Sequence, residues 1–358
     1  MAARVTLQDI ADALGVSRNT VSKAINNTGL LAEGTRERVL KKAVEMGYKQ
    51  FSYLNAAAEQ PEAEVPGKGA VGEIALLTMG FAGNTGFLPI MLDQFQRKFA
   101  RMGYSFTMHR VFGEDEEKLC LPASFDREKI SGVICIEMLD RGYCSMLCEL
   151  DLPILFVDSP AAGLHGALPA DVIYPDNHSS IYSFIREMGR RGKKRIGFIG
   201  ECMHCQSFFE RYMAYRNAMY LMGLPYQEEF CITGNKKGVK KPGAEEYREY
   251  LAENFSGQDA LPEVFVCAND YVAFDAMRVL KGMGISVPGE VWICGFDDTM
   301  ESRIMMPSLT TVHIHSHVMG DCAAYLLSSR MKDSSLYLRT VHTETNVCYR
   351  ETTGDEPI

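Results

Sequence analysis

The sequence lacks the segments that would carry a chain into or across a membrane. No apolar run approaches the ~18 residues that a membrane span requires. The first ten residues include Asp9 and contain no apolar stretch followed by a cleavage site, so no secretory signal is expected. The eleven cysteines are scattered and odd in number. We therefore expect reduced thiols, a cytoplasmic location and no membrane partner.

Motifs of the common enzyme classes are also missing. The sequence has no phosphate-binding loop, no G-x-S-x-G nucleophile turn and no H-E-x-x-H zinc motif. His313, His315 and His317 alternate and would share one face of a strand, but no fourth metal ligand accompanies them. Cys202 and Cys205 form a single C-x-x-C pair, whereas a zinc site normally uses two pairs. No catalytic residue, metal site or cofactor is therefore predicted.

Excess positive charge is absent from the chain as a whole, whose net charge is −9. The distribution is uneven, however. Residues 1–50 carry eight basic and five acidic side chains, and the rest of the chain is strongly acidic. Because phosphates attract a basic segment and repel an acidic one, the N-terminal segment alone is suited to nucleic acid.

The basic segment has the periodicity of three short helices between residues 5 and 47. Thr6 is placed to cap the first helix, and Gly15 suits the left-handed turn that ends it. Ser17 is placed to cap a second helix, and a third runs roughly from Thr35 to Met46. Apolar residues recur at helical spacing in all three helices and predict a shared core. They are Leu7, Ile10, Ala11, Leu14, Val21, Ala24, Ile25, Val39, Leu40, Ala43 and Val44.

The opposite face of the second helix is polar. Arg makes paired hydrogen bonds to guanine, and Asn to adenine, in the major groove. Arg18 and Asn19 fall in the first turn, where a recognition helix meets base edges. The pattern therefore predicts a helix-turn-helix, and a three-helix bundle with an incidentally polar face is the alternative. The polar face comprises Arg18, Asn19, Ser22, Lys23 and Asn26.

The composition changes after this head. Residues 49–70 have the Pro, Gly and Glu content of a linker. From Val71 onward, short β-rich runs alternate with amphipathic helical stretches, which predicts parallel sheet with helices on its faces. The length of this part exceeds what one core usually holds, so two lobes are expected. The β-rich runs are 73–78, 133–137, 154–158, 195–199, 264–268 and 291–296.

Polar residues follow several of these runs. Asp158, Asp176, Asn269 and Asp297 lie at or just beyond strand ends. Side chains at the carboxyl ends of parallel strands project into the crevice where such folds bind ligands. These residues are therefore candidate ligand contacts, although any one of them could instead cap a helix or brace a loop.

The head resembles that of LacI-type (lactose repressor) regulators. The resemblance lies in T-L-Q-D-I-A-D-A-L-G-V-S-R-N-T-V-S-K-A-I-N from Thr6 and T-R-E-R-V-L-K-K-A-V-E-M-G-Y from Thr35. It implies that the following segment is a hinge that wedges a leucine into the minor groove. Leu54 is the available wedge, because Ala57 stands at the expected position. The implied DNA-contacting residues are Thr6, Ser17, Arg18, Asn19, Ser22, Lys23, Asn26, Thr35 and Leu54.

The resemblance continues through the rest of the chain, most specifically at V-P-G-E-V-W-I-C-G-F-D-D, residues 287–298. It implies a type I periplasmic-binding-protein fold, with two Rossmann-like lobes joined by crossing strands. The implied organisation is a head at 1–48, a hinge and linker at 49–70, and an effector-binding and dimerisation domain at 71–358. The N-lobe would span about 71–168 and 313–340, and the C-lobe about 169–312 and 341–358. The implied effector contacts are Asn84, Phe87, Asp158, Tyr174, Asp176, Arg211, Asn269 and Asp297.

We therefore predict an α/β transcription regulator that binds DNA sequence-specifically under the control of a small-molecule effector. We expect this regulator to be a repressor. The resemblance implies a sugar or sugar derivative as effector, and a homodimer on a pseudo-palindromic double-stranded DNA operator. A purine or another metabolite remains open as effector. The alternatives are an enzyme that uses the cleft, a plain solute receptor, and a weak DNA binder or activator.

Overall fold

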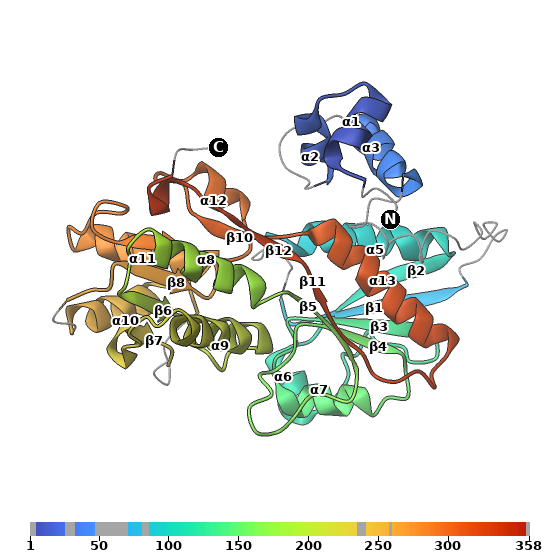
Figure 1. The fold of residues 1–358 in the computed structure, drawn as a ribbon. Coiled ribbons are helices and arrows are strands. Elements are labelled where there is room, and N and C mark those ends of the chain that lie inside the picture. Colours follow the sequence, from blue (N-terminus) through green and yellow to red (C-terminus); the bar gives the residue numbers. More distant parts are fainter. Residues whose placement is uncertain are drawn as a thin grey trace. The chain divides into compact units, whose positions relative to one another are not determined.

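The computed structural model describes residues 5–25, 33–46, 71–80, 86–234, 241–257 and 260–355 (Figure 1). The chain divides into two compact units, residues 1–65 and 66–358, and each is described by itself. The expected hinge and linker at 49–70 lie outside the described residues. No helix among the residues described is both long and apolar enough to cross a membrane.

The first unit contains three helices, α1 (Leu7–Leu14), α2 (Arg18–Ile25) and α3 (Glu33–Glu45). Thr6 caps α1 in a capping box: its hydroxyl accepts from the Asp9 backbone N–H, and the Asp9 carboxylate accepts from the Thr6 N–H. Gly15 ends α1 at φ 63°, a left-handed conformation that favours glycine. The three helices share a small apolar core, as predicted. Its buried members are Ile10, Ala11, Val21, Ala24, Val39 and Ala43.

The first lobe of the second unit is built on a six-stranded parallel sheet in the order β11-β5-β4-β3-β1-β2. Alternate residues of each strand face opposite layers. In β1, for example, Ile74 packs beneath α5 and α13, whereas Ala75 packs toward α7. The strands are β1 (Gly72–Thr78), β2 (Tyr104–Arg110), β3 (Ile130–Ile136), β4 (Ile154–Val157), β5 (Asp171–Pro175) and β11 (Thr340–Thr343). The helices are α5 (Leu88–Arg101), α6 (Gly113–Lys118), α7 (Arg141–Cys148) and α13 (Ser316–Lys332).

The second lobe is built on a four-stranded parallel sheet in the order β7-β6-β8-β9. Helices cover both faces, with α8 and α9 contributing to one apolar cluster and α10 and α11 to the other (Figure 1). The strands are β6 (Ile196–Ile199), β7 (Cys231–Ile232), β8 (Val264–Cys267) and β9 (Trp292–Cys294). The helices are α8 (Ser179–Arg190), α9 (Gln206–Leu221), α10 (Glu245–Ser256), α11 (Asp270–Gly282) and α12 (Met300–Ile304), with 3-10 turns η2 (Glu228–Phe230) and η3 (Glu351–Thr353).

The two lobes are joined by a two-stranded antiparallel pair, β10 (Thr311–Ile314) and β12 (Thr345–Cys348). After β10 the chain re-enters the first lobe as α13, which packs closely on α5. At this crossing, a Cβ on Gly320 would lie 2.5 Å from the Met91 carbonyl oxygen, so only glycine fits there. The predicted α/β class, with two Rossmann-like lobes and crossing strands, is confirmed.

The lobe boundaries differ from the sequence expectation. The first segment of the N-lobe was expected to end near residue 168. In the structure, however, β5 pairs with β4, and β11 pairs with β5, in the first sheet. These pairings place residues 171–175 and all of β11 in the first lobe. The crossover instead follows Pro175, since α8 packs against α9 of the second lobe.

Candidate functional site

The polar face of α2 is open to solvent. Arg18 and Asn19 are exposed in its first turn, and Ser22 and Lys23 are half-buried one turn later. Val21 and Ala24, on the other face, are buried in the head core. The structure therefore leaves the predicted recognition residues on an accessible surface, and their contact with DNA stays a prediction.

Two predicted DNA-contacting residues have hydroxyls engaged in helix caps. Thr6 caps α1, and the Ser17 hydroxyl accepts from the Thr20 backbone N–H at 3.0 Å. Both hydroxyls therefore stabilise helix starts, and at α1 the Asp9 carboxylate also lies at the positive helix end. Thr35 is half-buried in α3. The remaining two, Asn26 and Leu54, lie outside the described residues.

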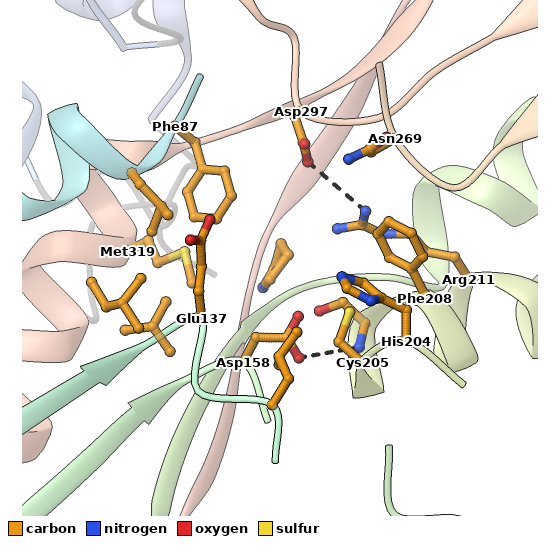
Figure 2. Close-up of a pocket in the computed structure, with 16 residues that line it drawn as sticks. Phe87, Glu137, Asp158, His204, Cys205, Phe208, Arg211, Asn269, Asp297 and Met319 are labelled. Carbon is orange, nitrogen blue, oxygen red and sulfur yellow. Dashed lines mark hydrogen bonds and ion pairs between the residues drawn. The ribbon is translucent and has the colours of Figure 1, made fainter. Parts of the chain in front are cut away.

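A cleft lies between the two lobes of the second unit, with an empty volume of about 660 Å³ including its open mouth. The size suits a small-molecule ligand. Figure 2 shows Phe87, Glu137 and Met319 of the first lobe facing Arg211, Asn269 and Asp297 of the second. The predicted residues that line it are Phe87, Asp158, Arg211, Asn269 and Asp297. The others are Leu88, Ile136, Glu137, Leu139, Val157, Pro175, His204, Cys205, Ser207, Phe208 and Met319.

Three carboxylic acids reach the cleft from strand ends. Glu137 directly follows β3, Asp158 directly follows β4, and Asp297 comes shortly after β9. Their φ angles are 56°, 64° and 112°, in the left-handed region that non-glycine residues rarely adopt. Such strain persists where the surrounding structure holds a residue in a functional position. The shared geometry indicates that the backbone turns at these strand ends to direct acids into the cleft.

Arg211 is a buried cation in the cleft wall, with 4% of its surface exposed. Its Nε donates to Asn177 Oδ1 at 2.9 Å and its Nη1 to the Ala268 carbonyl at 2.7 Å. Its guanidinium carbon lies 3.5 Å from the centre of the Phe296 ring, and Nη1 is 3.8 Å from Asp297 Oδ1. These contacts hold the guanidinium at a fixed angle beside Asp297, as Figure 2 shows.

Asp297 and Asp270 are buried acids with unusual proton affinity. Burial raises the pKa of Asp297 to about 7; Arg211 opposes the rise and the charge of Asp158 adds to it. Burial and the charge of Asp297 raise the pKa of Asp270 to about 8. Asp270 lies behind the cleft and accepts hydrogen bonds from Thr299 and Thr311. Raised pKa values in a cleft are typical of functional sites.

Asn269 and Asp158 combine a structural role with a place in the cleft. The Asn269 side-chain oxygen caps α11 by accepting from the Val272 N–H at 3.0 Å. Figure 2 shows its amide nitrogen on the side of the cleft. Asp158 Oδ1 accepts from the Ser159 N–H and, across the lobes, from the Ser207 N–H at 3.2 Å. Both residues therefore accept hydrogen bonds at the start of a helix, as the helix-capping alternative proposed, and both also line the cleft.

Tyr174 and Asp176 were expected in the cleft, and the structure places them elsewhere. Pro175 lines the cleft, so its neighbours on the extended chain point away from it. The Tyr174 hydroxyl is 2.7 Å from Ser159 Oγ. Asp176 Oδ1 accepts from the backbone N–H groups of residues 178 and 179 at the start of α8. Asn84, also expected here, lies outside the described residues.

Glu137 and His204 line the cleft but were not predicted to do so. Burial raises the pKa of Glu137, and burial lowers the pKa of His204, whose ring lies 5.2 Å from that of Phe208. Glu137 ends a predicted strand, so the rule that identified Asp158 also applies to it. His204 lies within the C-x-x-C segment, where burial raises the pKa of both thiols. Among the residues described, no group of three or more His, Cys, Asp or Glu side chains could hold a metal ion.

The buried acids predict a pH-dependent stability. The folded protein retains protons on Asp270 and Asp297 between the ordinary Asp pKa of 3.8 and about 7 to 8, whereas the unfolded chain releases them. The free energy of unfolding should therefore fall by several kcal/mol as pH rises from 5 to 8, because each pKa unit is worth about 1.4 kcal/mol. Urea denaturation at several pH values in this range should show that the free energy of unfolding changes less steeply with pH in Asp270→Asn than in wild type. An equally steep change in both proteins would contradict the raised pKa of Asp270.

Comparisons with known proteins agree with this geometry. The model described as "Bacterial regulatory proteins, lacI family" matches residues 6–50, and that described as "Periplasmic binding protein-like domain" matches residues 185–353. The transcriptional regulator GalR of Lacticaseibacillus casei is 27% identical over 96% of this chain and 98% of its own. The repressor PurR of Vibrio parahaemolyticus is 24% identical over 97% and 98%.

Solved structures share the fold. The transcriptional regulator CelR in complex with cellobiose aligns with a TM-score of 0.67 and 22% identity, over 98% of this chain and 100% of that one. The lac repressor dimer bound to operator and the anti-inducer ONPF aligns with a TM-score of 0.61 and 18% identity, over 98% and 99%.

A helix-turn-helix head on a two-lobed, cleft-bearing body defines a DNA-binding transcription regulator with a ligand-binding domain. The relatives named above are transcription regulators rather than enzymes. The head matches the lacI family of bacterial regulatory proteins over residues 6–50, and the two named relatives align with almost the whole chain at 24% to 27% identity.

Proposed function

We propose that this chain is a cytoplasmic, homodimeric repressor of transcription whose affinity for a pseudo-palindromic operator is set by a small neutral carbohydrate in the cleft. The observation that carries the proposal is the buried Arg211–Asp297 pair, which faces Phe87 across the space between the lobes. A ligand that contacts both walls binds one arrangement of the lobes better than another. It shifts the equilibrium between them by that difference in affinity.

The chemistry of the cleft favours a polyol. Sugar hydroxyls need acceptors and donors, which Asp158, Asp297 and the Asn269 amide offer. The apolar face of a sugar ring needs a flat apolar partner, and Phe87 and Phe208 supply one from each lobe. The CelR structure with cellobiose is a neighbour of known fold that was solved with a sugar.

The balance of charge favours a neutral sugar over a phosphorylated one. Glu137, Asp158 and Asp297 provide three carboxyl groups, against the one guanidinium of Arg211 among the residues that line the cleft. Arg211 is already committed to Asn177, Ala268 and Phe296. An anionic ligand would face the carboxylate of Asp158, and it would oppose ionisation of Glu137 and Asp297, whose pKa values burial already raises.

A dimer is part of the proposal because each head can read one half-site. Arg18 and Asn19 are exposed on a single short helix, and one such helix covers only part of an operator. A second copy related by two-fold symmetry would double the contacts and read the mirrored half-site. The lac repressor structure, solved as a dimer on its operator, supports this arrangement.

Two measurements on the full-length protein test the proposal. Selection from a random duplex pool should enrich a palindromic sequence. A thermal-shift panel that pairs neutral mono- and disaccharides with their phosphate esters should show stabilisation by a neutral member and at least about tenfold weaker binding of its ester. If the selection enriched no common DNA sequence, sequence-specific DNA binding would be contradicted. Stabilisation by an ester alone would contradict the neutral effector.

A further inference from the structure

Glu210 occupies a half-buried position on α9, one residue before Arg211, where three side chains from different elements meet it. Its Oε2 accepts from Asn177 Nδ2 at 2.8 Å, and its Oε1 accepts from Gln206 Nε2 at 3.0 Å. His342 Nε2 lies 3.5 Å from Glu210 Oε2. His342 belongs to β11 of the first lobe and Glu210 to α9 of the second, so this pair spans the two lobes.

His342 is held in place on its own side. It pairs in register with Tyr174 of β5, and the two rings stack with centres 5.2 Å apart and planes at 25°. The start of β11 is anchored by Asp171, which is 1% exposed and accepts from both the backbone and the guanidinium of Arg339. Because strand and ring are both fixed, the imidazole presents Nε2 to α9 without a large loss of side-chain entropy.

The same network reaches the effector cleft through Asn177. This side chain is fully buried: its oxygen accepts from Arg211 Nε, and its nitrogen donates to Glu210 and to Ser207 Oγ at 3.3 Å. The carboxylate of Glu210 thus fixes which way the Asn177 amide points. The amide orientation in turn fixes the acceptor that holds the Arg211 guanidinium.

We propose that Glu210 and His342 are positioning residues that tie the two lobes together behind the cleft and hold Arg211 in its ligand-facing orientation. The effector role of Arg211 rests on the function proposed above, whereas the tie itself does not. Neither residue lines the cleft. They act on the ligand only through Asn177 and Arg211 and through the separation of the lobes.

The strength of the Glu210–His342 interaction depends on pH, and the groups around the two side chains determine the direction of this dependence. The hydrogen bond and charge of Glu210, together with the charge of Asp176, raise the pKa of His342 above 6.5 despite its partial burial. Burial alone would raise the pKa of Glu210, but hydrogen bonds from His342, Asn177 and Gln206 bring it below 4.5. The groups facing His342 are Tyr174 on β5, Asp176 and His178 before α8, and Glu210 on α9.

A His whose pKa is raised by folding contributes its full stabilisation at pH values below its unfolded-state pKa. This stabilisation is lost as pH rises through its folded-state pKa. A carboxylate whose pKa is lowered by folding contributes its full stabilisation at pH values above its unfolded-state pKa. The tie is therefore strongest between pH 4.5 and 6.5 and weakens as His342 loses its proton at higher pH.

Two backbone N–H groups report directly on lobe separation. The Gln206 N–H donates to the Ser159 carbonyl at 2.8 Å, and the Ser207 N–H donates to Asp158 Oδ1. Both bonds run from α9 of the second lobe to the loop after β4 of the first. Their hydrogen exchange, corrected for the intrinsic pH dependence, measures how often the lobes part at this edge.

The experiment uses the full-length protein without effector or DNA, so its failure is distinguishable from failure of the proposed function. The His342 ring is titrated by NMR, and exchange at residues 206–207 is measured at pH 6.0 and 8.5. The variants are Glu210→Gln, His342→Gln and the shorter acid Glu210→Asp. Glu249→Gln and His165→Gln, at exposed positions elsewhere, are the matched controls.

In wild type we expect protection at residues 206–207 to fall about fivefold from pH 6.0 to 8.5, the size expected for a part-buried ion pair. Glu210→Gln should bring the His342 pKa down toward 6.5 and remove the pH dependence; His342→Gln should also remove it. Glu210→Asp should retain part of the pH dependence of protection, and the control variants should behave as wild type. A His342 pKa that Glu210→Gln leaves unchanged, or wild-type protection equal at both pH values, would overturn the proposal.

Discussion

Arg211→Ala is expected to weaken effector binding strongly and to destabilise the effector-binding unit by about 3–5 kcal/mol, because it leaves buried polar groups without partners. The substitution removes the donor to Asn177 and to the Ala268 carbonyl, and it deprives Asp297 of its nearby cation. A ligand that spans the cleft would also lose one wall of its site. We expect its affinity to fall at least about 100-fold, the equivalent of about 2.7 kcal/mol.

Urea denaturation gives the stability change, and calorimetric titration of the ligand identified by thermal shift gives the affinity. Arg216→Ala, one turn further along α9, is the matched control, since Arg216 is exposed and does not line the cleft. Arg211→Lys keeps the charge but loses the forked donors, so it should recover little of the affinity. Ligand affinity within threefold of wild type in Arg211→Ala would show that the ligand binds elsewhere.

Arg18→Ala should weaken binding to the selected operator by about 10- to 100-fold and flatten the preference at one base position of each half-site. The reason is geometric, since Arg18 is exposed in the first turn of α2, where a side chain reaches base edges. Binding to random duplex should change far less, because phosphate contacts dominate it. Fold stability should be unaffected, as Arg18 is exposed and is not a member of the head core.

Competition binding against operators with single base changes, at several salt concentrations, measures this effect. Arg216→Ala again serves as the control, because it removes a positive charge outside the head. An equal loss of affinity for operator and random duplex would assign Arg18 to phosphate rather than to base recognition.

The head could be predicted closely because its determinants are local. The cap at Thr6, the turn at Gly15 and the apolar spacing of Ile10, Val21 and Val39 all act within a short stretch of chain. The start of α3 was the exception, since the helix begins at Glu33 rather than Thr35. The hinge cannot be judged in the same way, because Leu54 lies outside the described residues.

The cleft could be predicted only in part because it depends on register and on side-chain direction. Asp158 and Asp297 follow strands and face the cleft, but Asp176, which also follows a strand, faces away because the chain alternates through Pro175. Glu137 was missed because it was counted as the last residue of a strand. The roles of Asn177 and His342 depend on contacts between segments that are far apart in sequence, and no local pattern reveals them.

The central claim is that the cleft governs the head, and operator affinity measured across an effector titration tests it most directly. Fluorescence anisotropy of the selected operator should show a change of at least about fivefold at saturating ligand, the lower end of measured allosteric couplings. Calorimetry should then show the reciprocal change in ligand affinity when operator is present. The account would be contradicted by a ligand that binds tightly at Arg211 and Asp297 while operator affinity stays constant.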